Sequence, residues 1–460
     1  MYNIMKSNNE KKDIYYNRLK THKSGMKYLI AKNSCESNNI SSIMLVVRVG
    51  AIHERNNEKG ISHFLEHLLF SGTCHKYDRK KNIYGPCKEN YNDIFKEVDN
   101  LNGNLNAYTD KDHTAYHITL PNKHFKNGMN ILFDIINNTK FRTSKIEKER
   151  NIVMEEFFMK NDEVEEELNN QLFGTVFEGH PLELKTIGGK KYIENYNLPL
   201  INKYFNKYYV SGNMYLIVVS NLSKNVISRN INNYMSNLKV KHTNDIVEIP
   251  KYTNIIDRTS PVLRIIEKDS DNCNINFGFL IPGHHNKDKF SIYILSQILG
   301  ELYSCRLFTE LREKNSLVYN IESGTLLYND YGIFVINSQC DYKNSYTVIQ
   351  KILEELDKLK NKKVFDEEIK LAKNKLIYNI ENKNQLGIFN LAELLTYKVL
   401  YYGKNIPTKE DDISNINNVT KKDILNTANN IFNYNKMSCI CSGNIDRKKV
   451  KNLFKSYISK

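Results

Sequence analysis

The sequence predicts an α+β fold of two homologous domains, each a mainly antiparallel sheet covered by helices on one face. Three observations support this prediction. The 460 residues are too many for one ordinary core and suit two domains of about 200 residues. Apolar runs of strand length alternate with longer stretches of helical periodicity, and the strands pair like hairpins. The order of these elements recurs in the second half of the chain.

The recurrence is visible element by element. In the first half, a strand at 42–49 precedes a helix, two strands near Tyr108 and His117, and two further helices. In the second half, a strand at 274–280 precedes a helix at 289–299, strands at 319–325 and 332–338, and two helices. We therefore predict an N-terminal domain over 1–241, a linker over 242–259 and a C-terminal domain over 260–460.

Composition restricts the classes of partner. The 66 Lys and Arg residues outnumber the 52 Asp and Glu residues and give a net charge of +14. The chain is also rich in Asn, Ile and Tyr and carries no nucleic-acid motif, so we expect no nucleic-acid partner. No apolar run is long enough to span a bilayer.

Location is predicted from what the sequence lacks. Eight cysteines without a CxxC pair indicate reduced thiols. The first thirty residues show neither a secretory nor a transit pattern. We expect a cytoplasmic protein, with the mitochondrial matrix as the alternative.

Residues 60–73, GISHFLEHLLFSGT, place three ionisable groups in an apolar helix. The apolar residues recur at helical spacing and form one stripe. His63 and His67 are four residues apart and share another face, with Glu66 beside them. Burying such groups costs free energy unless something pairs with them.

The pattern His-x-x-Glu-His is that of inverzincin metallopeptidases. Two imidazoles one turn apart supply half of a tetrahedral zinc site, and a neighbouring carboxylate can take a proton from water. The alternative is a pair of surface histidines on an amphipathic helix. A further protein ligand is needed to decide between the two.

A long helix from Lys145 to about Phe173, without Gly or Pro, offers that ligand. Glu149 and Glu156 are seven residues apart and therefore lie on one helix face. Either glutamate could be the ligand by chemistry alone, and Glu155 is the nearest rival.

The chain resembles the pitrilysin-type (M16) zinc peptidases, in particular the branch of bacterial processing-type proteases and the catalytic subunit of mitochondrial processing peptidase. The resemblance extends over about residues 20–455. It rests on GISHFLEHLLFSGT, on NLNAYT at 104–109 followed by HTAY at 113–116, on ERNIVMEE at 149–156, on GHPL at 179–182 and on RLFTELREKNSLVY at 306–319.

The resemblance implies one zinc ion per chain, held by His63, His67 and Glu156, with Glu66 as general base. Glu149 matches a carboxylate that orients a ligand. The third ligand lies about a dozen residues further along the chain than is usual in the family. The insert at 74–92 accounts for the difference and should loop out on the surface; its role is not predicted.

The resemblance also implies where substrate binds. A peptide would add an extended strand beside the edge strand. Arg312 and Tyr319 match positions that contact substrate or the developing oxyanion, and Glu163 and Glu166 are candidates to recognise presequence arginines, although one expected acid is Asn170. The residues predicted to bind substrate are Asn104, Asn106, Ala107, Tyr108, Glu163 and Glu166.

These features predict a zinc metalloendopeptidase that hydrolyses peptides or unfolded, presequence-like segments held in extended form in a closed chamber. The second half has Ile294-Leu295-Ser296-Gln297 where the first has its metal motif, so only one half can hold zinc. Family architecture implies a chamber of four such domains, and therefore a homodimer or a heterodimer with a related subunit. The alternative is a non-catalytic structural or assembly subunit of the same fold.

Overall fold

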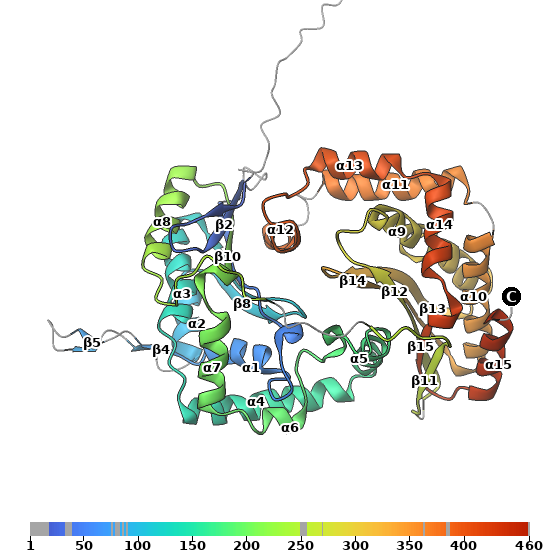
Figure 1. The fold of residues 1–460 in the computed structure, drawn as a ribbon, viewed down its shortest axis with the longest axis horizontal. Coiled ribbons are helices and arrows are strands. Elements are labelled where there is room, and N and C mark those ends of the chain that lie inside the picture. Colours follow the sequence, from blue (N-terminus) through green and yellow to red (C-terminus); the bar gives the residue numbers. More distant parts are fainter. Residues whose placement is uncertain are drawn as a thin grey trace, which may run out of the picture.

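The computed structural model describes residues 18–32, 39–74, 77–78, 83–84, 87–88, 91–248, 255–268, 270–361, 364–382 and 387–458. Two sheets with their helices stand side by side in Figure 1, the first in blue to green and the second in yellow to red. The predicted α+β class with two mainly antiparallel sheets is confirmed.

The first sheet has six strands in the order β1-β2-β10-β3-β9-β8. Only the pair β2 and β10 is parallel. The strand bounds are β1 Lys20–Thr21, β2 Lys27–Lys32, β3 Ile40–Val47, β8 Asn104–Thr109, β9 Thr114–Pro121 and β10 Met214–Ser220. Strand β8 forms one edge of this sheet.

The second sheet repeats this topology in the order β11-β15-β12-β14-β13, with β11 and β15 parallel. Its strands are β11 Val262–Ile266, β12 Asn272–Pro282, β13 Val318–Leu327, β14 Tyr331–Asp341 and β15 Ser438–Ser442. Strand β13 occupies the edge position that β8 has in the first sheet, as the internal repeat predicts.

Helices follow the same repeat. In the first half they are α1 Ile61–Leu69, α2 Tyr91–Asn100, α3 Phe125–Asn137, α4 Thr143–Asp162, α5 Val164–Val176, α6 Lys190–Ile193, α7 Leu198–Tyr208 and α8 Lys224–Ser236. In the second half they are α9 Lys289–Ser296, α10 Ser345–Asn361, α11 Asp366–Glu381, α12 Ile388–Tyr402, α13 Lys409–Asn418, α14 Lys421–Ile431 and α15 Arg447–Ile458.

Strand β3 is apolar on both faces, and the structure shows why. Ile43 and Leu45 point into the main core beneath the first-half helices. Met44 and Val46 point the other way and pack against apolar residues of α12, among them Leu395. A strand buried on both faces reads as a continuous apolar run instead of an alternating one.

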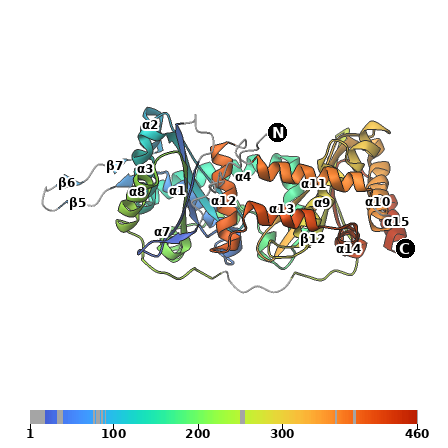
Figure 2. The ribbon, with the colours of Figure 1, turned by 90° about the horizontal axis from the view of Figure 1, so that it is seen from above.

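The two halves exchange one helix each. Helix α12, from the second half, lies across β3 and β10 of the first sheet, and α5, from the first half, lies across β12 and β15 of the second (Figures 1 and 2). Leu168, Leu172 and Val176 of α5 join Ile333 and Ile440 in one buried cluster. Each sheet therefore has its own helices on one face and the partner half's helix on the other. The predicted boundaries at 241 and 260 are crossed by this exchange and stay predictions.

The single long helix predicted from Lys145 to about Phe173 is wrong. The chain leaves helical geometry at Glu163, where φ is −76° and ψ is 114°, and α5 then starts at Val164. The run Glu165, Glu166 and Glu167 occupies the first turn of α5, where negative charge favours a new helix N-terminus. This break allows α5 to leave α4 and reach the second sheet.

Gly278 on β12 lies directly against α5. A Cβ atom at this position would lie 2.8 Å from Leu172 Cδ1 and 2.9 Å from Val176 Cγ2. Gly278→Ala is therefore expected to destabilise the protein by about 1–3 kcal/mol, as overpacking does. The midpoint of urea unfolding measures this loss.

Gly324→Ala on β13 is the matched control, because its nearest neighbour, Val335 Cγ2, would be 3.7 Å away. Equal midpoints for the two variants would contradict a close approach of α5 at Gly278.

The described parts of the insert form two short ladders, Thr73–Cys74 with Cys87–Lys88 and Tyr77–Asp78 with Ile83–Tyr84. They lead away from the first domain in Figure 2, as predicted for a surface loop. The last two residues of the predicted insert, Tyr91 and Asn92, do not loop out but begin helix α2. Residues 75–76, 79–82, 85–86 and 89–90 lie outside the described residues.

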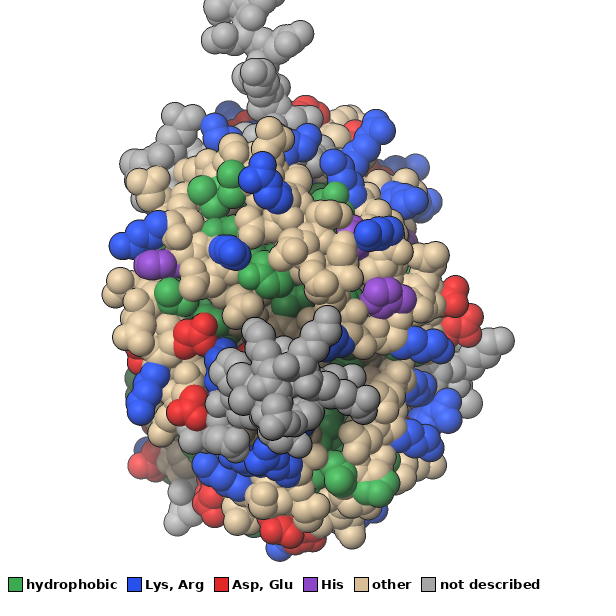
Figure 3. Space-filling model, turned by 90° about the vertical axis from the view of Figure 1, so that its left-hand side faces the viewer, with side chains coloured by type: hydrophobic (Ala, Val, Ile, Leu, Met, Phe, Trp, Pro, Cys, Tyr) green, Lys and Arg blue, Asp and Glu red, His purple; other side chains and the backbone are tan. Residues whose placement is uncertain are grey.

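Two further predictions are that the chain has no nucleic-acid partner and no segment that spans a membrane. The charge on the surface bears on the first of these, and the length and composition of the helices bear on the second. On the face in Figure 3, Lys and Arg side chains are spread among acidic and uncharged ones and form no single basic field. No helix in the described part of the chain is both long and apolar enough to cross a membrane.

Candidate metal centre

The histidine helix α1 starts at a buried turn that is capped by the side chain of Glu54. Gly60 precedes it with φ +93°, in the left-handed region that favours glycine. The buried Glu54 carboxylate accepts hydrogen bonds from the backbone N–H groups of Gly60, at 2.6 Å, and Ser62, at 3.0 Å. Burial raises the pKa of Glu54 to about 8, although these hydrogen bonds oppose the shift. These contacts fix where the first turn of α1 begins.

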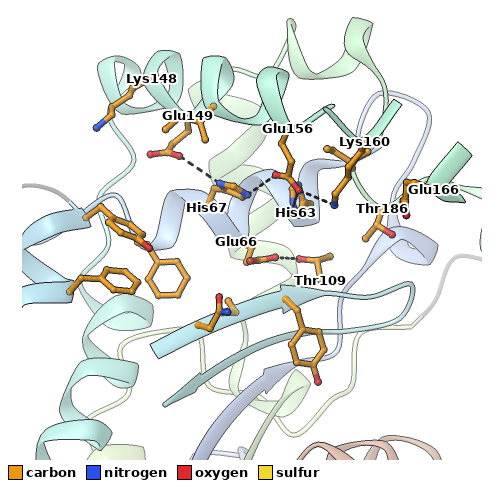
Figure 4. A pocket seen from close by; sticks show the side chains of 18 of the residues that line it. His63, Glu66, His67, Thr109, Lys148, Glu149, Glu156, Lys160, Glu166 and Thr186 are labelled. Carbon is orange, nitrogen blue, oxygen red and sulfur yellow. Dashed lines mark hydrogen bonds and ion pairs between the residues drawn. The ribbon is translucent and has the colours of Figure 1, made fainter. Parts of the chain in front are cut away.

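The structure brings the three predicted ligands together. His63 Nε2 lies 3.6 Å from Glu156 Oε1, and His67 Nε2 lies 3.4 Å from Glu156 Oε2. The ligand atoms of these residues all lie within 4.8 Å of one another. Helices α1 and α4 pack against each other and supply all three (Figure 4).

These residues fit a zinc ion. Bond lengths of about 2.0–2.1 Å in a tetrahedral site put the ligand atoms about 3.3 Å apart, close to both distances above. Two imidazoles and one carboxylate are also a donor set typical of catalytic zinc, with one position left for water or substrate. His63 and His67 each direct Nε2 at the carboxylate, so the same nitrogen of each ring would bind the metal.

The electrostatics of the metal-free site favour a cation at this point. Burial lowers the pKa of His63 to about 4, and the neighbouring His67 adds to the effect. Burial also raises the pKa of Glu156, but contacts with His67, His63 and Lys160 outweigh it and hold the pKa at about 2. For His67, burial is outweighed by Glu149 and Glu156, which raise the pKa to about 9. Glu156 is therefore ionised at neutral pH, as a metal ligand must be.

Two charged groups flank the ligands. Glu149 Oε2 lies 3.8 Å from His67 Nδ1, the ring nitrogen that does not face Glu156. This is the place of the orienting carboxylate predicted for Glu149. Lys160 Nζ lies 2.9 Å from Glu156 Oε1. The lysine was not predicted, although its i,i+4 spacing from Glu156 is a signal in the sequence.

Glu66 lies on α1, between the two histidines, and its side chain faces the edge strand β8. Its Oε2 atom accepts a 2.6 Å hydrogen bond from the Thr109 hydroxyl at the end of β8. Burial raises the pKa of Glu66, and the Thr109 hydrogen bond limits the rise. The carboxylate is thereby held beside the ligands and turned toward β8 (Figure 4).

A cavity of about 730 Å³ joins these groups. Its lining includes residues 106–109 of β8 together with His63, Glu66, His67, Glu149 and Glu156. An extended peptide laid along β8 would therefore pass the ligands and Glu66.

The predicted substrate residues divide between the cavity and its surroundings. Asn106, Ala107, Tyr108 and Glu166 line it. Asn104 begins β8, and Glu163 lies at the break between α4 and α5, both outside the lining. Asn170 also lines the cavity and donates from Nδ2 to Glu166 Oε1 at 3.4 Å.

Arg312 and Tyr319 are not brought to the cavity. Both lie in the second half, where Arg312 Nη1 donates to the backbone oxygen of Tyr319 at 2.8 Å. The Tyr319 side chain is 63% exposed. Within one chain this pair contacts neither the ligands nor Glu66.

Other residues of the site were missed from the sequence. Thr109 acts on a side chain of another element, and Glu54 acts on backbone groups at the start of the helix that follows it. No local sequence pattern therefore marks either residue. Phe70, Tyr91 and Phe95 line the cavity as one aromatic group, with the rings of Tyr91 and Phe95 stacked at 3.9 Å.

Comparison with known families matches both halves of the chain. The family described as insulinase (peptidase family M16) matches residues 29–190, which contain all three ligands and Glu66. The family described as the peptidase M16 inactive domain matches residues 196–376.

Individual relatives cover most of the chain. An uncharacterized zinc protease of Rickettsia felis is 28% identical over 404 residues, covering 88% of this chain and 92% of the relative. The mitochondrial-processing peptidase subunit beta of Dictyostelium discoideum is 22% identical over 412 residues, covering 85% of this chain and 82% of the relative.

Solved structures share the fold. A protease from Helicobacter pylori superimposes with a TM-score of 0.82 at 19% identity, covering 92% of this chain and 98% of that one. The periplasmic protease PqqL from Escherichia coli gives a TM-score of 0.79 at 16% identity, covering 97% of this chain and 50% of that one.

Proposed function

Because the chain belongs to peptidase family M16, and its relatives include proteins named zinc proteases, we propose that it is a zinc-dependent endopeptidase. The observation that carries the proposal is the convergence of His63, His67 and Glu156 with Glu66 in one cavity beside an edge strand. The proposed substrate is a peptide or an unfolded segment bound in extended form. The proposed stoichiometry is one zinc ion per chain.

Each residue then has a defined task. Zinc, when bound, would polarise the scissile carbonyl and lower the pKa of water at the site. Glu66 accepts the proton of the attacking water and passes it to the leaving amine. The backbone of β8 aligns the peptide through main-chain hydrogen bonds, which are independent of side-chain sequence. Glu149 holds the ring of His67 through Nδ1.

Removal of the metal tests this proposal directly. Dialysis against a strong zinc chelator is expected to abolish hydrolysis of an unfolded polypeptide, because the proposed reaction needs the Lewis acid that zinc supplies. Addition of one equivalent of Zn²⁺ per chain should restore the rate. Undiminished hydrolysis by the fully metal-free protein would show that another mechanism is at work.

The proposal also includes a preference for basic residues in the substrate. Glu166 places a carboxylate in the cavity wall, and Asn170 beside it is uncharged. We propose that Glu166 favours an arginine near the cleaved bond. Peptide pairs that differ only by an Arg or a Gln test it, since equal kcat/KM values for both would remove the preference.

We propose that the protein forms a dimer, either with a second copy of this chain or with a related subunit. This chain covers 50% of PqqL, so a second copy or a related subunit could supply an equivalent second half. Arg312 and Tyr319 lie away from this chain's own cavity, and we propose that they act in the cavity of the partner. A fully active monomer in analytical ultracentrifugation would contradict this assembly.

The proposed compartment is a reducing one, the cytoplasm or, alternatively, the mitochondrial matrix. Support comes from the cysteines of the described chain that are free and buried, Cys273, Cys305, Cys340, Cys439 and Cys441.

The alternative function is a non-catalytic structural or assembly subunit of the same fold. A solved complex III from Candida albicans shares the fold, with a TM-score of 0.76 at 16% identity. The complete set of ligands and Glu66 in this chain favours the peptidase.

A further inference from the structure

The turn that follows the edge strand carries a second cluster of ionisable groups. Asp110, Asp112 and His113 connect β8 to β9, and their ligand atoms lie within 4.8 Å of one another. Asp112 and His113 are buried. The proposed mechanism does not use this cluster.

Protein groups already bind all three side chains. His113 Nδ1 lies 2.7 Å from Asp112 Oδ1, and the Tyr401 hydroxyl donates to Asp112 Oδ2 at 2.7 Å. The Tyr397 hydroxyl donates to Asp110 Oδ2 at 3.3 Å. The carboxylate oxygens that could hold a metal are thus engaged by hydrogen-bond donors, and the cluster is a hydrogen-bonded network.

This network joins the two halves of the chain. Tyr397 and Tyr401 belong to α12, the second-half helix that lies across the first sheet, whereas Asp110, Asp112 and His113 belong to the first half. Tyr401 is 8% exposed, so the Tyr401–Asp112 hydrogen bond is shielded from water. Removal of one partner would leave a buried carboxylate incompletely satisfied, which is costly.

The other side of the same turn reaches Glu66. Thr109 directly precedes Asp110, and its hydroxyl donates to Glu66 Oε2 at 2.6 Å. The turn is closed by the backbone hydrogen bond from Asp110 N to His113 O at 2.8 Å. Asp112, which contacts Tyr401, lies three positions after Thr109, which contacts Glu66. The closed turn leaves little freedom between the two contacts.

We propose that Tyr401 is a positioning residue for the peptidase site. By holding Asp112, α12 fixes the turn, and the turn fixes the Thr109 hydroxyl against Glu66. The inference rests on the proposed function, because it assigns Glu66 the role of general base. It adds that the second half controls the geometry of that base within the same chain.

Tyr401→Phe tests the role by removing one hydroxyl group. We expect kcat for peptide hydrolysis to fall about tenfold, because small misplacements of catalytic groups cost one to two orders of magnitude. KM should stay within about twofold of the wild-type value, and bound zinc should stay unchanged. A variant with wild-type kcat would overturn the proposal.

Tyr402→Phe is the matched control on the next residue. Its hydroxyl accepts from Lys289 Nζ at 2.6 Å and donates to the His284 backbone oxygen at 3.4 Å, both in the second half. Wild-type kinetics are expected. A tenfold fall in this control as well would show that any lost hydroxyl on α12 disturbs the fold, and would count against Tyr401.

A double-variant cycle with Thr109→Val separates positioning from general stability. If Tyr401 acts through Thr109, the double variant should be no slower than Thr109→Val alone, since coupled residues are non-additive. If the rate losses of the two single variants multiply in the double variant, Tyr401 does not act through Thr109, and the proposal is overturned.

Hydrogen exchange provides a readout that does not need activity. In Tyr401→Phe, the amide of Asp110 should exchange at least about tenfold faster than in Tyr402→Phe, because the turn is loosened. If the wild type hydrolyses no peptide, the proposed function fails, while this comparison still decides whether Tyr401 holds the turn. Equal exchange in both variants would show that it does not.

Discussion

Glu66→Gln is expected to lower kcat for peptide hydrolysis by about 100- to 10,000-fold, the usual effect of removing a general base. Glutamine keeps the shape of the side chain and can still bond to Thr109, but it cannot accept a proton from water. Glu66 is not among the three ligands, so bound zinc should remain near the wild-type value. Hydrolysis of an unfolded polypeptide and metal content by mass spectrometry measure the two quantities together.

The same pair of measurements contains the control. Loss of zinc along with activity would mean that Glu66 supports the metal centre and not the proton transfer. Wild-type turnover in the glutamine variant would remove Glu66 from the mechanism, and another acid of the cavity would have to act as the base.

Glu156→Gln is expected to lower zinc affinity by more than about 100-fold. Even groups that only orient a ligand change metal affinity by about 10- to 100-fold when replaced, and Glu156 faces both histidines at 3.4–3.6 Å. Its carboxylate also supplies the negative charge that a dication requires, which an amide does not. Titration against a chelating dye of known zinc affinity measures the change.

Glu155→Gln is the matched control, one residue earlier on the same helix. Glu155 is exposed and is absent from the cavity lining, so its replacement should leave zinc affinity within about twofold. The opposite ranking of the two variants would assign the third ligand to Glu155, the rival that sequence alone left open.

Zinc affinity should also weaken on acidification. In the metal-free chain the pKa of His67 is about 9, so a proton occupies the ring at neutral pH and zinc must displace it. As pH falls, the competing proton becomes more abundant and binding requires more free metal. The same dye titration between pH 6 and 9 would record this slope.

The candidate metal site could be predicted because its chemistry is concentrated in short segments. His63, Glu66 and His67 lie within one turn of a helix, and the resemblance then selected Glu156 over Glu149. The repeat could also be predicted, because β8 and β13 each begin a hairpin and each hairpin is followed by two helices in the sequence. Local spacing and element order are properties that a sequence displays directly.

Features that depend on distant packing were not predictable. The break at Glu163 lies in a stretch without Gly or Pro, and its benefit arises only when α5 meets the second sheet. The sequence analysis predicts a strand at 42–49, but it does not predict that both faces of β3 are buried or that α12 covers one of them. Glu54 caps a helix from six residues before Gly60, a contact with no established spacing.

The crossed packing of α5 and α12 has a consequence for how the molecule is made. A fragment ending at residue 241 would present Met44 and Val46 to water and would carry α5 with its apolar side bare. A fragment starting at residue 260 would have the complementary defect. During synthesis the N-terminal portion cannot complete its structure until the ribosome has released α12, so the full polypeptide, and not the domain, is the smallest unit that can reach the native state.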